Sequence, residues 1–300
     1  MDFRELSYIV AIAKHQSVTK AANELYVTQP TLSKFVQNLE KQLGQPIFRR
    51  LGNKFLLTYA GERYVQRAHE MLAVKKQLDQ ELQDIVRKDM GELNIAFPFM
   101  RGTYMLPATL PPFRELYPRV RMNVFEANSD ALENMILQGE VDLAFFNVPI
   151  RSPDVSFRVL SGEEFVLVMA KDNPLAQCGT VRAGCKFPWM DLELTRKETF
   201  LLQLPEQRSR QTADRLFREA HVEPAHVLQV RNIFASVQLA ASGYGMTFVS
   251  ESHLRHIDSD PAIFSVGTPS TQTDFVAAYR RGVYLPQYAR DFIDIVKEKI

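Results

Sequence analysis

Apolar residues spaced three and four positions apart mark the first two elements of the chain. In residues 3–15 they are Phe3, Leu6, Ile9, Val10 and Ala13, a spacing that predicts an amphipathic helix. A second, shorter helix is expected to run to Leu25. Its first free backbone N–H can be capped by the hydroxyl of Ser17. The turn Tyr26-Val27 then separates this helix from a third one.

The third helix has one apolar and one polar face. Thr28 is its expected cap, Pro30 falls in its first turn and Gly44 ends it. One stripe is apolar: Leu32, Phe35, Val36, Leu39 and Leu43. Amide and short hydroxyl side chains on the other face suit base edges and phosphates. A surface helix of any bundle is the alternative, but a short helix, a tight turn and a capped helix in this order favour DNA reading.

A short basic hairpin and a long helix follow. Residues 47–50 and 54–57 are strand-like runs around the turn pair Gly52-Asn53, and they predict a hairpin that carries Arg49, Arg50 and Lys54. An ordinary solvated hairpin is the alternative. Thr58 can cap a helix that extends to about residue 88. Its seam has heptad spacing and is interrupted only by Lys75: Tyr64, Ala68, Met71, Lys75, Leu78, Leu82 and Ile85. We expect a homodimer through this seam; packing on the chain's own core is the alternative.

From residue 90 onward, strand and helix patterns alternate. Strands are predicted at 93–99, 120–126, 141–148, 165–171, 199–204, 226–230, 246–249 and 275–280. Helices are predicted at 103–116, 130–138, 206–220, 233–241 and 286–299. Such alternation indicates a doubly wound α/β fold, in which ligands bind at the carboxyl ends of the strands. The return of the chain to the first lobe through 275–280 predicts two lobes joined by a hinge.

Composition and charge narrow the class of protein. The chain has 300 residues, 46% of them hydrophobic and 24% charged, which fits two or three soluble domains. Its two cysteines, Cys178 and Cys185, fit a reducing cytoplasm, and we expect neither a secretory signal nor a membrane span. Residues 1–60 carry a net charge of +4, against −3 for the remaining 240 residues. We therefore expect a polyanion to bind the N-terminal part of the chain only.

The chain resembles the LysR-type transcriptional regulators over essentially its whole length. The motifs that carry the resemblance are Ser17-Val18-Thr19-Lys20-Ala21-Ala22, Gln29-Pro30, Leu32-Ser33, Leu39-Glu40, Leu43-Gly44, Phe48, Arg50, Leu57-Thr58 and Gly61-Glu62. The resemblance implies a winged helix-turn-helix over residues 1–58, a dimerising linker helix over 59–89 and an effector-binding domain over 90–300. That domain would have two α/β lobes, as in type 2 periplasmic binding proteins: about 91–162 with 266–300, and about 163–265.

The resemblance, together with the polar face and the wing, selects the candidate DNA contacts. They are Thr19, Gln29, Pro30, Thr31, Ser33, Lys34, Gln37, Arg49, Arg50 and Lys54. Lys34 stands where many members have arginine, and it offers a point charge in place of a rigid fork. The expected partners are a pseudo-palindromic double-stranded DNA site and further copies of the chain, as a homodimer or a homotetramer of two dimers.

The effector cleft is implied by the same resemblance. Its first wall would be the turn at residues 97–103, where many members place Ser or Thr to hold an anion at a helix N-terminus. This chain has Pro98 and Phe99 there, which favours a bulkier, apolar or aromatic ligand. The candidate lining residues are Phe99, Met100, Gly102, Thr103, Asn128, Ser129, Asn147, Gln203, Asn232, Phe234 and Thr247.

No catalytic, metal or cofactor motif is recognised in the sequence. His253 and His256 lie three positions apart near two aspartates, but they are interpreted as surface histidines. A thiol switch at Cys178 and Cys185 would make the protein a redox-sensing regulator. An alternative from another class is a solute-binding or catalytic α/β protein with an N-terminal interaction module. The expected function is ligand-controlled, sequence-specific regulation of transcription.

Overall fold

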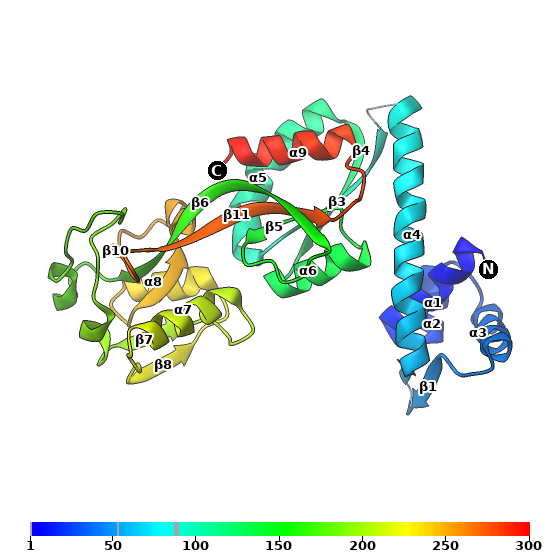
Figure 1. The fold of residues 1–300 in the computed structure, drawn as a ribbon, viewed down its shortest axis with the longest axis horizontal. Helices are drawn as coiled ribbons and strands as arrows, with labels where there is room; N and C mark the ends of the chain where they lie inside the picture. Colours follow the sequence, from blue (N-terminus) through cyan, green and yellow to red (C-terminus); the bar gives the residue numbers. More distant parts are fainter. Residues whose placement is uncertain (1, 53, 87–89) are drawn as a thin grey trace. The chain divides into compact units, whose positions relative to one another are not determined.

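A computed structural model describes residues 2–52, 54–86 and 90–300 of the chain (Figure 1). The chain divides into two compact units. The first contains nearly all residues up to 88, and the second contains nearly all that follow. Each unit is described by itself.

The first unit is a helical domain with a small hairpin and one long helix. Its elements are α1 (Phe3–His15), α2 (Val18–Glu24), α3 (Gln29–Leu43), β1 (Phe48–Leu51), β2 (Lys54–Leu57) and α4 (Tyr59–Val86). The predicted caps are present: Ser17 accepts a hydrogen bond from the N–H of Lys20, and Thr28 accepts one from Thr31. Gly44 ends α3 in the left-handed region at φ 69°, where a residue without a side chain is least strained.

The core of this unit is formed by the inner faces of α1, α2 and α3. Its buried members are Tyr8, Ile9, Ala11, Ile12, Val18, Ala21, Ala22, Leu32, Val36, Ile47 and Phe48. Tyr8 and Phe35 meet edge to face with ring centroids 5.4 Å apart. Because Ala21 and Ala22 are small, α2 can lie close to its neighbours. The apolar periodicity read from the sequence matches the buried face in the middle of α1 and α3, whereas Phe3 and Leu43 at the ends of the predicted stripes are exposed.

The second unit is organised around a mixed sheet with the strand order β10-β6-β11-β5-β3-β4. The strands are β3 (Met90–Phe97), β4 (Arg119–Glu126), β5 (Leu143–Asn147), β6 (Val155–Met169), β9 (Thr247–Ser250), β10 (Ala262–Ser265) and β11 (Thr271–Arg280). β3 pairs in parallel with β4 and β5, whereas β11 is antiparallel to β5 and β6. β9 joins the sheet on β6, and β7 (Thr199–Leu202) pairs with β8 (His226–Gln229).

Two lobes share the long strands β6 and β11, which run from one to the other (Figure 1). Lobe I adds β3, β4 and β5 with α5 (Phe99–Leu116), α6 (Ser129–Gln138) and α9 (Gln287–Glu298). Lobe II adds β7 to β10 with α7 (Arg208–Glu219) and α8 (Ile233–Ala241). Three short 3₁₀ helices are Pro174–Gln177, Leu192–Thr195 and Glu251–His256, the last called η3 below.

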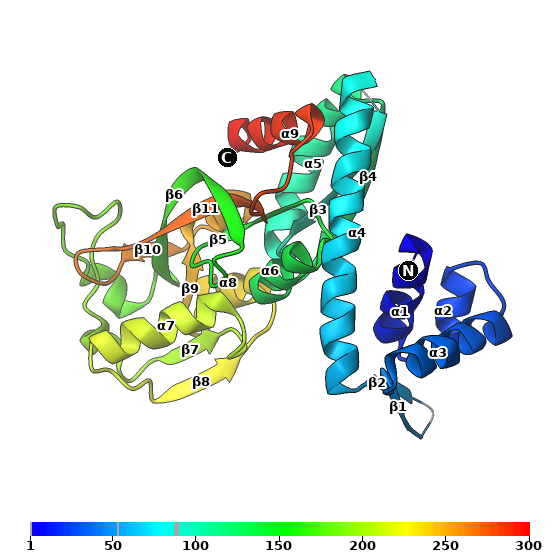
Figure 2. The same ribbon diagram turned by 45° about the vertical axis from the view of Figure 1, so that its right-hand side comes forward.

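Strands β3 and β5 of lobe I are buried on both faces over most of their length, which explains their apolar runs, whereas the edge strand β4 is largely exposed. Ala144 and Phe146 of β5 face the core beneath α6. Phe145 lies between them in sequence and faces the other way, where its ring centroid is 5.7 Å from that of Phe292 on α9. Helices α5 and α9 lie side by side on this second face (Figure 2).

Several predicted boundaries are wrong. α5 begins at Phe99, four residues before the expected start, so the predicted turn at 97–103 is largely helix. The predicted strand 165–171 is the second half of β6, a strand of 15 residues that crosses both lobes. Strand β10 was not predicted, and Pro174 begins a 3₁₀ helix in place of the expected loop. None of the described helices is long and apolar enough to cross a bilayer.

Candidate functional site

The polar face of α3 is exposed along its length. Leu32 and Val36 are buried beneath it, whereas Gln29, Lys34 and Gln37 are exposed. Gln29 donates a hydrogen bond from Nε2 to Ser33 Oγ at 2.7 Å, so two of the predicted DNA contacts hold each other one turn apart. Of the other predicted contacts in this region, Thr19, Pro30 and Thr31 are exposed and Ser33 is half-buried. The helix offers donors and acceptors on a rigid support.

The hairpin β1–β2 forms the predicted basic wing, but its cations are divided between two faces. Opposite residues of an antiparallel pair share a face, and Arg50 is opposite Phe55 whereas Arg49 is opposite Leu56. Arg50 places its guanidinium 5.9 Å from the centroid of the Phe55 ring, on the face that also carries buried Phe48. Arg49 therefore lies on the other face, with Lys54. Both arginines are exposed.

Two polar side chains fix the wing to the helices. Glu40 of α3 accepts hydrogen bonds at Oε1 from the N–H groups of Ile47 and Phe48, at 2.8 and 3.0 Å. Thr58 donates to the carbonyl of Pro46 at 2.7 Å and accepts from the N–H of Gly61 at 3.0 Å. A side chain at Gly61 would place Cβ 2.1 Å from a backbone oxygen, so α4 can lie this close only with glycine there. The spacing of the reading helix and the wing is thus set by the fold.

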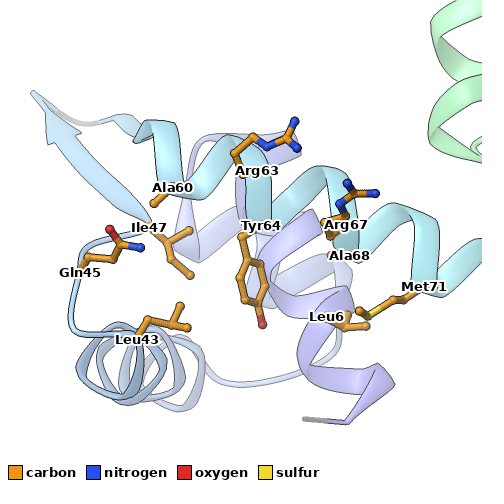
Figure 3. Close-up of a pocket in the computed structure, with 10 residues that line it drawn as sticks. All are labelled: Leu6, Leu43, Gln45, Ile47, Ala60, Arg63, Tyr64, Arg67, Ala68 and Met71. Atoms are coloured by element: carbon orange, nitrogen blue, oxygen red, sulfur yellow. The ribbon is translucent and has the colours of Figure 1, made fainter.

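An apolar cavity of about 260 Å³ lies where α4 passes α1 and the end of α3 (Figure 3). It is lined by Leu6, Leu43, Gln45, Ile47, Ala60, Arg63, Tyr64, Arg67, Ala68 and Met71. Tyr64 reaches between α1 and α3. Burial raises the pKa of its hydroxyl, and the negative charge of Glu5 raises this pKa further. Ala68 is buried within its own chain, so its predicted place in a dimer seam is wrong. Packing on the chain's own core applies at this end of α4.

Farther along α4 the predicted seam is open. Met71, Val74, Leu78 and Leu82 are all exposed, Leu78 by 54%. The side chain of Ile85 lies outside the described residues. Exposure of four apolar side chains three and four positions apart on a helix is unfavourable in water, so this stripe favours a covering partner.

The second unit contains a buried cluster that the sequence analysis did not identify. Arg101 of α5 is 1% exposed and forms a two-armed ion pair with Glu163 of β6, at 2.7 and 2.8 Å. Its Nη1 also donates to Ser252 of η3 at 3.0 Å, and its Nη2 to Asn147 of β5 at 2.9 Å. The ring of Phe275 lies 4.1 Å from the guanidinium carbon. One side chain thereby joins α5, β5, β6 and η3.

Burial and charge shift several pKa values in this cluster. Burial alone would raise the pKa of Glu163, but the hydrogen bonds and charge of Arg101 hold it below its usual range. Burial lowers the pKa of His253 to about 3, with a further contribution from Arg101. His253 is therefore neutral at physiological pH and is hydrogen-bonded through Nδ1 to the hydroxyl of Tyr104 at 3.1 Å. Burial also raises the pKa of that hydroxyl and lowers the pKa of His256, whose ring stacks on Tyr104 at 3.9 Å.

Two of the predicted effector contacts are buried, and a third is half-buried. Thr247 is fully buried and donates to the carbonyl of Leu201 at 2.7 Å, so it holds one strand to another. Gln203 is buried and donates to Ser236 at 3.1 Å. Asn147 is committed to the Arg101 cluster, because its Nδ2 also donates to Glu163 at 3.0 Å. The interpretation of His253 as a surface histidine is wrong, since it is buried.

The other predicted effector contacts begin helices or lie near their starts. Asn128 caps α6 by accepting from the N–H of Ala131, and Asn232 caps α8 by accepting from the N–H of Phe234. Phe99 and Phe234 are exposed. Ser129 is half-buried at the start of α6, and Met100 packs against the apolar core of lobe II. Gly102 and Thr103 lie within α5, where the Thr103 hydroxyl donates to the carbonyl of Phe99.

A weak sequence signal pointed to Arg101. Met105, Thr109 and Phe113 form the buried stripe of α5 at intervals of four residues, and Arg101 continues it by one turn. An arginine at an apolar position indicates a buried partner. The local sequence pattern does not indicate that this partner is Glu163.

The two cysteines are not bonded to each other. Cys178 is exposed, and Cys185 donates from Sγ to the carbonyl of Pro269 at 3.1 Å. Over the described residues, no group of three or more His, Cys, Asp or Glu side chains is arranged to hold a metal ion.

Comparison with known families finds two matches that together span nearly the whole chain. The model of the LysR substrate binding domain matches residues 87–300. The model described as bacterial regulatory helix-turn-helix protein, lysR family, matches residues 3–62. The uncharacterized transcriptional regulator YcgK of Bacillus subtilis is 27% identical over an alignment of 310 residues that covers 100% of this chain and 95% of YcgK. The Hca operon transcriptional activator HcaR of Escherichia coli is 27% identical over 307 residues, 100% of this chain and 98% of HcaR.

Solved structures share the fold along its full length. Full-length OxyR from Pseudomonas aeruginosa superposes with a TM-score of 0.74 at 24% identity, covering 100% of this chain and 94% of that one. Full-length CbnR in complex with its target DNA superposes with a TM-score of 0.61 at 21% identity, covering all of both chains.

Proposed function

The chain belongs to the LysR family of transcriptional regulators, and we propose that it reads DNA with α3 and the wing under control of a small molecule bound in its second unit. The observation that carries the DNA part is the exposed polar face of α3 beside a basic hairpin, both held by Glu40 and Thr58. We propose the boundaries 1–58, 59–89 and 90–300 for the DNA-binding, linker and effector-binding segments. Family membership favours regulation over catalysis, and we place its action in the cytoplasm.

Within the DNA interface, Lys34 and Gln37 are proposed to contact bases or phosphates from α3. Arg50 and Arg49 point to opposite faces of the wing, so we assign them to different parts of the duplex. Among the described residues neither forms an ion pair, and both remain available to phosphates. Arginine suits a narrow minor groove because its charge meets enhanced negative potential there.

We propose that a homodimer forms through the open seam of α4, and a tetramer from two such dimers. Met71, Leu78 and Leu82 supply the apolar contacts. Two recognition helices of one dimer would then meet half-sites roughly 34–36 Å apart, or a multiple of that spacing, in a pseudo-palindromic site.

The ligand of the second unit is proposed to be apolar or aromatic rather than a simple anion. Pro98 precedes α5, and its side chain has no hydrogen-bonding group that could help to hold an anion at the start of that helix. Phe99 and Phe234 are the exposed aromatic side chains among the candidates. The effector-binding domain of QuiR, which shares the fold at 21% identity, has been solved with shikimate, which supports a small-molecule ligand but not its apolar character.

The test of the DNA proposal is a binding measurement on the full chain. DNA selected from a random pool is titrated with wild type, with Lys34→Ala and with Arg215→Ala, at several salt concentrations. Arg215 is an exposed arginine of α7 and serves as the charge-matched control. We expect Lys34→Ala to weaken binding roughly 10-fold and to reduce the salt slope by about 1. Wild-type affinity and slope in Lys34→Ala would exclude this use of α3.

A further inference from the structure

A group of ion pairs joins α7 of lobe II to α6 of lobe I. Arg208, the first residue of α7, donates from Nε to Asp130 at 2.9 Å and from Nη2 to Glu133 at 2.6 Å. Its Nη1 donates to the backbone carbonyl of Asn147 at 3.1 Å. Every arm of this guanidinium is therefore bonded to lobe I, although its helix belongs to lobe II.

Arg208 and Glu133 are shielded from water, whereas Asp130 is partly exposed. The Arg208 side chain is 9% exposed, and that of Glu133 is buried as well. The guanidinium carbon lies 4.9 Å from the centroid of the Phe146 ring. Separating a cation from its partners in such surroundings is costly, because the effective dielectric constant is low.

A second bridge lies beside the first. Arg151 of lobe I pairs with Asp130 at 2.9 Å and donates to Gln211 of α7 at 2.8 Å. The two arginines and two carboxylates balance in charge, so the group is stable as a set and each member depends on the others.

Each of the two helices also has apolar contacts within its own lobe. Leu132 and Ile136 anchor α6 in the core of lobe I. Leu216 and Phe217 anchor α7 in the core of lobe II. The ion pairs therefore add a lobe-to-lobe connection between helices that are each packed in the core of their own lobe.

The lobes are also connected by a pair of continuous strands, with the Arg101 cluster beside them. β6 and β11 cross between the lobes, and their register shifts between Phe275 and Val276. Strands with an irregularity at the crossing can bend there while their hydrogen bonds persist on either side. Opening about this hinge would separate Arg208 from Asp130 and Glu133.

We propose that Arg208, Asp130 and Glu133 form an interlobe latch, closed in this structure, whose open–closed equilibrium is what the small-molecule ligand shifts. The inference rests on the proposed function, since it assigns the regulation of the same two-lobed unit. A latch of this kind gives the domain two discrete states, and a ligand with unequal affinity for them changes their populations.

The test measures the distance between the lobes in the full chain. Cys178→Ser and Cys185→Ser remove the native thiols, and spin labels are placed at Glu115→Cys on α5 and Arg218→Cys on α7, both exposed positions. Labelled chain is diluted with unlabelled chain so that only distances within one subunit are recorded. We expect Arg208→Met to raise the ratio of long to short distances at least about 10-fold, because a buried ion pair has lost one partner.

A second variant and a control complete the design. Asp130→Asn should shift the distances in the same direction, and it decides the question if Arg208→Met does not fold. Arg215→Met is the control, because Arg215 pairs with Glu219 within α7 and should leave the distances unchanged. Unchanged distances in Arg208→Met and Asp130→Asn, or an equal shift in Arg215→Met, would overturn the latch. Failure of the wild type to select DNA would refute the proposed function while leaving the distance result to stand.

Discussion

Breaking the Arg101–Glu163 pair should reveal how strongly the crossing between the lobes depends on a buried charge. Glu163→Gln keeps the size of the side chain but removes its charge, and it leaves a guanidinium that is 1% exposed. Arginine cannot escape this cost by losing its proton, because a guanidinium stays protonated in proteins. Loss of one partner of a buried pair costs about 3–5 kcal/mol. That is a large share of a typical stability of roughly 5–15 kcal/mol.

The reverse variant should behave differently with pH. In Arg101→Met the orphaned Glu163 is free to take up a proton, because burial raises its pKa once the cation is gone. A folded carboxyl with a raised pKa binds protons that the unfolded chain does not, so stability is regained as pH falls towards the unfolded value of about 4.3. The cost of Arg101→Met relative to wild type should therefore be smaller at pH 5 than at pH 7, whereas the cost of Glu163→Gln should not shrink in this way.

Urea unfolding followed by Trp189 fluorescence is the assay. Trp189 is the one tryptophan of the chain and donates to the carbonyl of Gly267, so its signal reports on the second unit. The double variant Arg101→Met with Glu163→Gln should be more stable than the sum of the single effects by about 2 kcal/mol or more, since it leaves no unpaired charge. A coupling below about 0.5 kcal/mol, or a cost of Glu163→Gln below about 1 kcal/mol, would refute the reasoning.

Three further outcomes are expected. Leu78→Asp should lower the dimer fraction in sedimentation, because it places a charge in the α4 seam; an intact dimer would move the interface to the second unit. Unfolding free energy should fall by roughly 2 kcal/mol between pH 6.5 and 5 through His253, whose folded pKa of about 3 lies below its unfolded value, and His253→Gln should remove this part. Replacing Cys178 and Cys185 with Ser should leave the response of DNA binding to peroxide unchanged; a lost response would establish a thiol switch.

The sequence by itself determined the elements of the first unit. Helices α1, α2 and α3 were predicted from signals that act within a few residues: the apolar periodicity of α1 and α3, the caps of α2 and α3 at Ser17 and Thr28, and the terminating Gly44. The division of the wing's cations between two faces also follows from the alternation of side chains along a strand, although we did not predict it from the sequence. Local rules of this kind need no knowledge of distant contacts.

Boundaries in the second unit depended on more than local pattern. β6 was predicted only over its apolar second half. Its first half, with Phe157 and Arg158, is largely exposed and therefore has no continuous apolar run that would predict a buried strand. The start of α5 was missed because Pro98 suggested a turn, whereas proline directly before a helix is compatible with its first residues.

Only the tertiary structure decided which charged residues matter in the second unit. Arg101 meets Glu163 across 62 positions and Ser252 across 151. Arg208 meets Asp130 across 78 positions. No periodicity links residues so far apart, because their encounter is fixed by how the sheet and helices pack and not by the neighbours of either residue. The sequence therefore predicts which surface of the chain contacts DNA, and the packing reveals how its two lobes are held together.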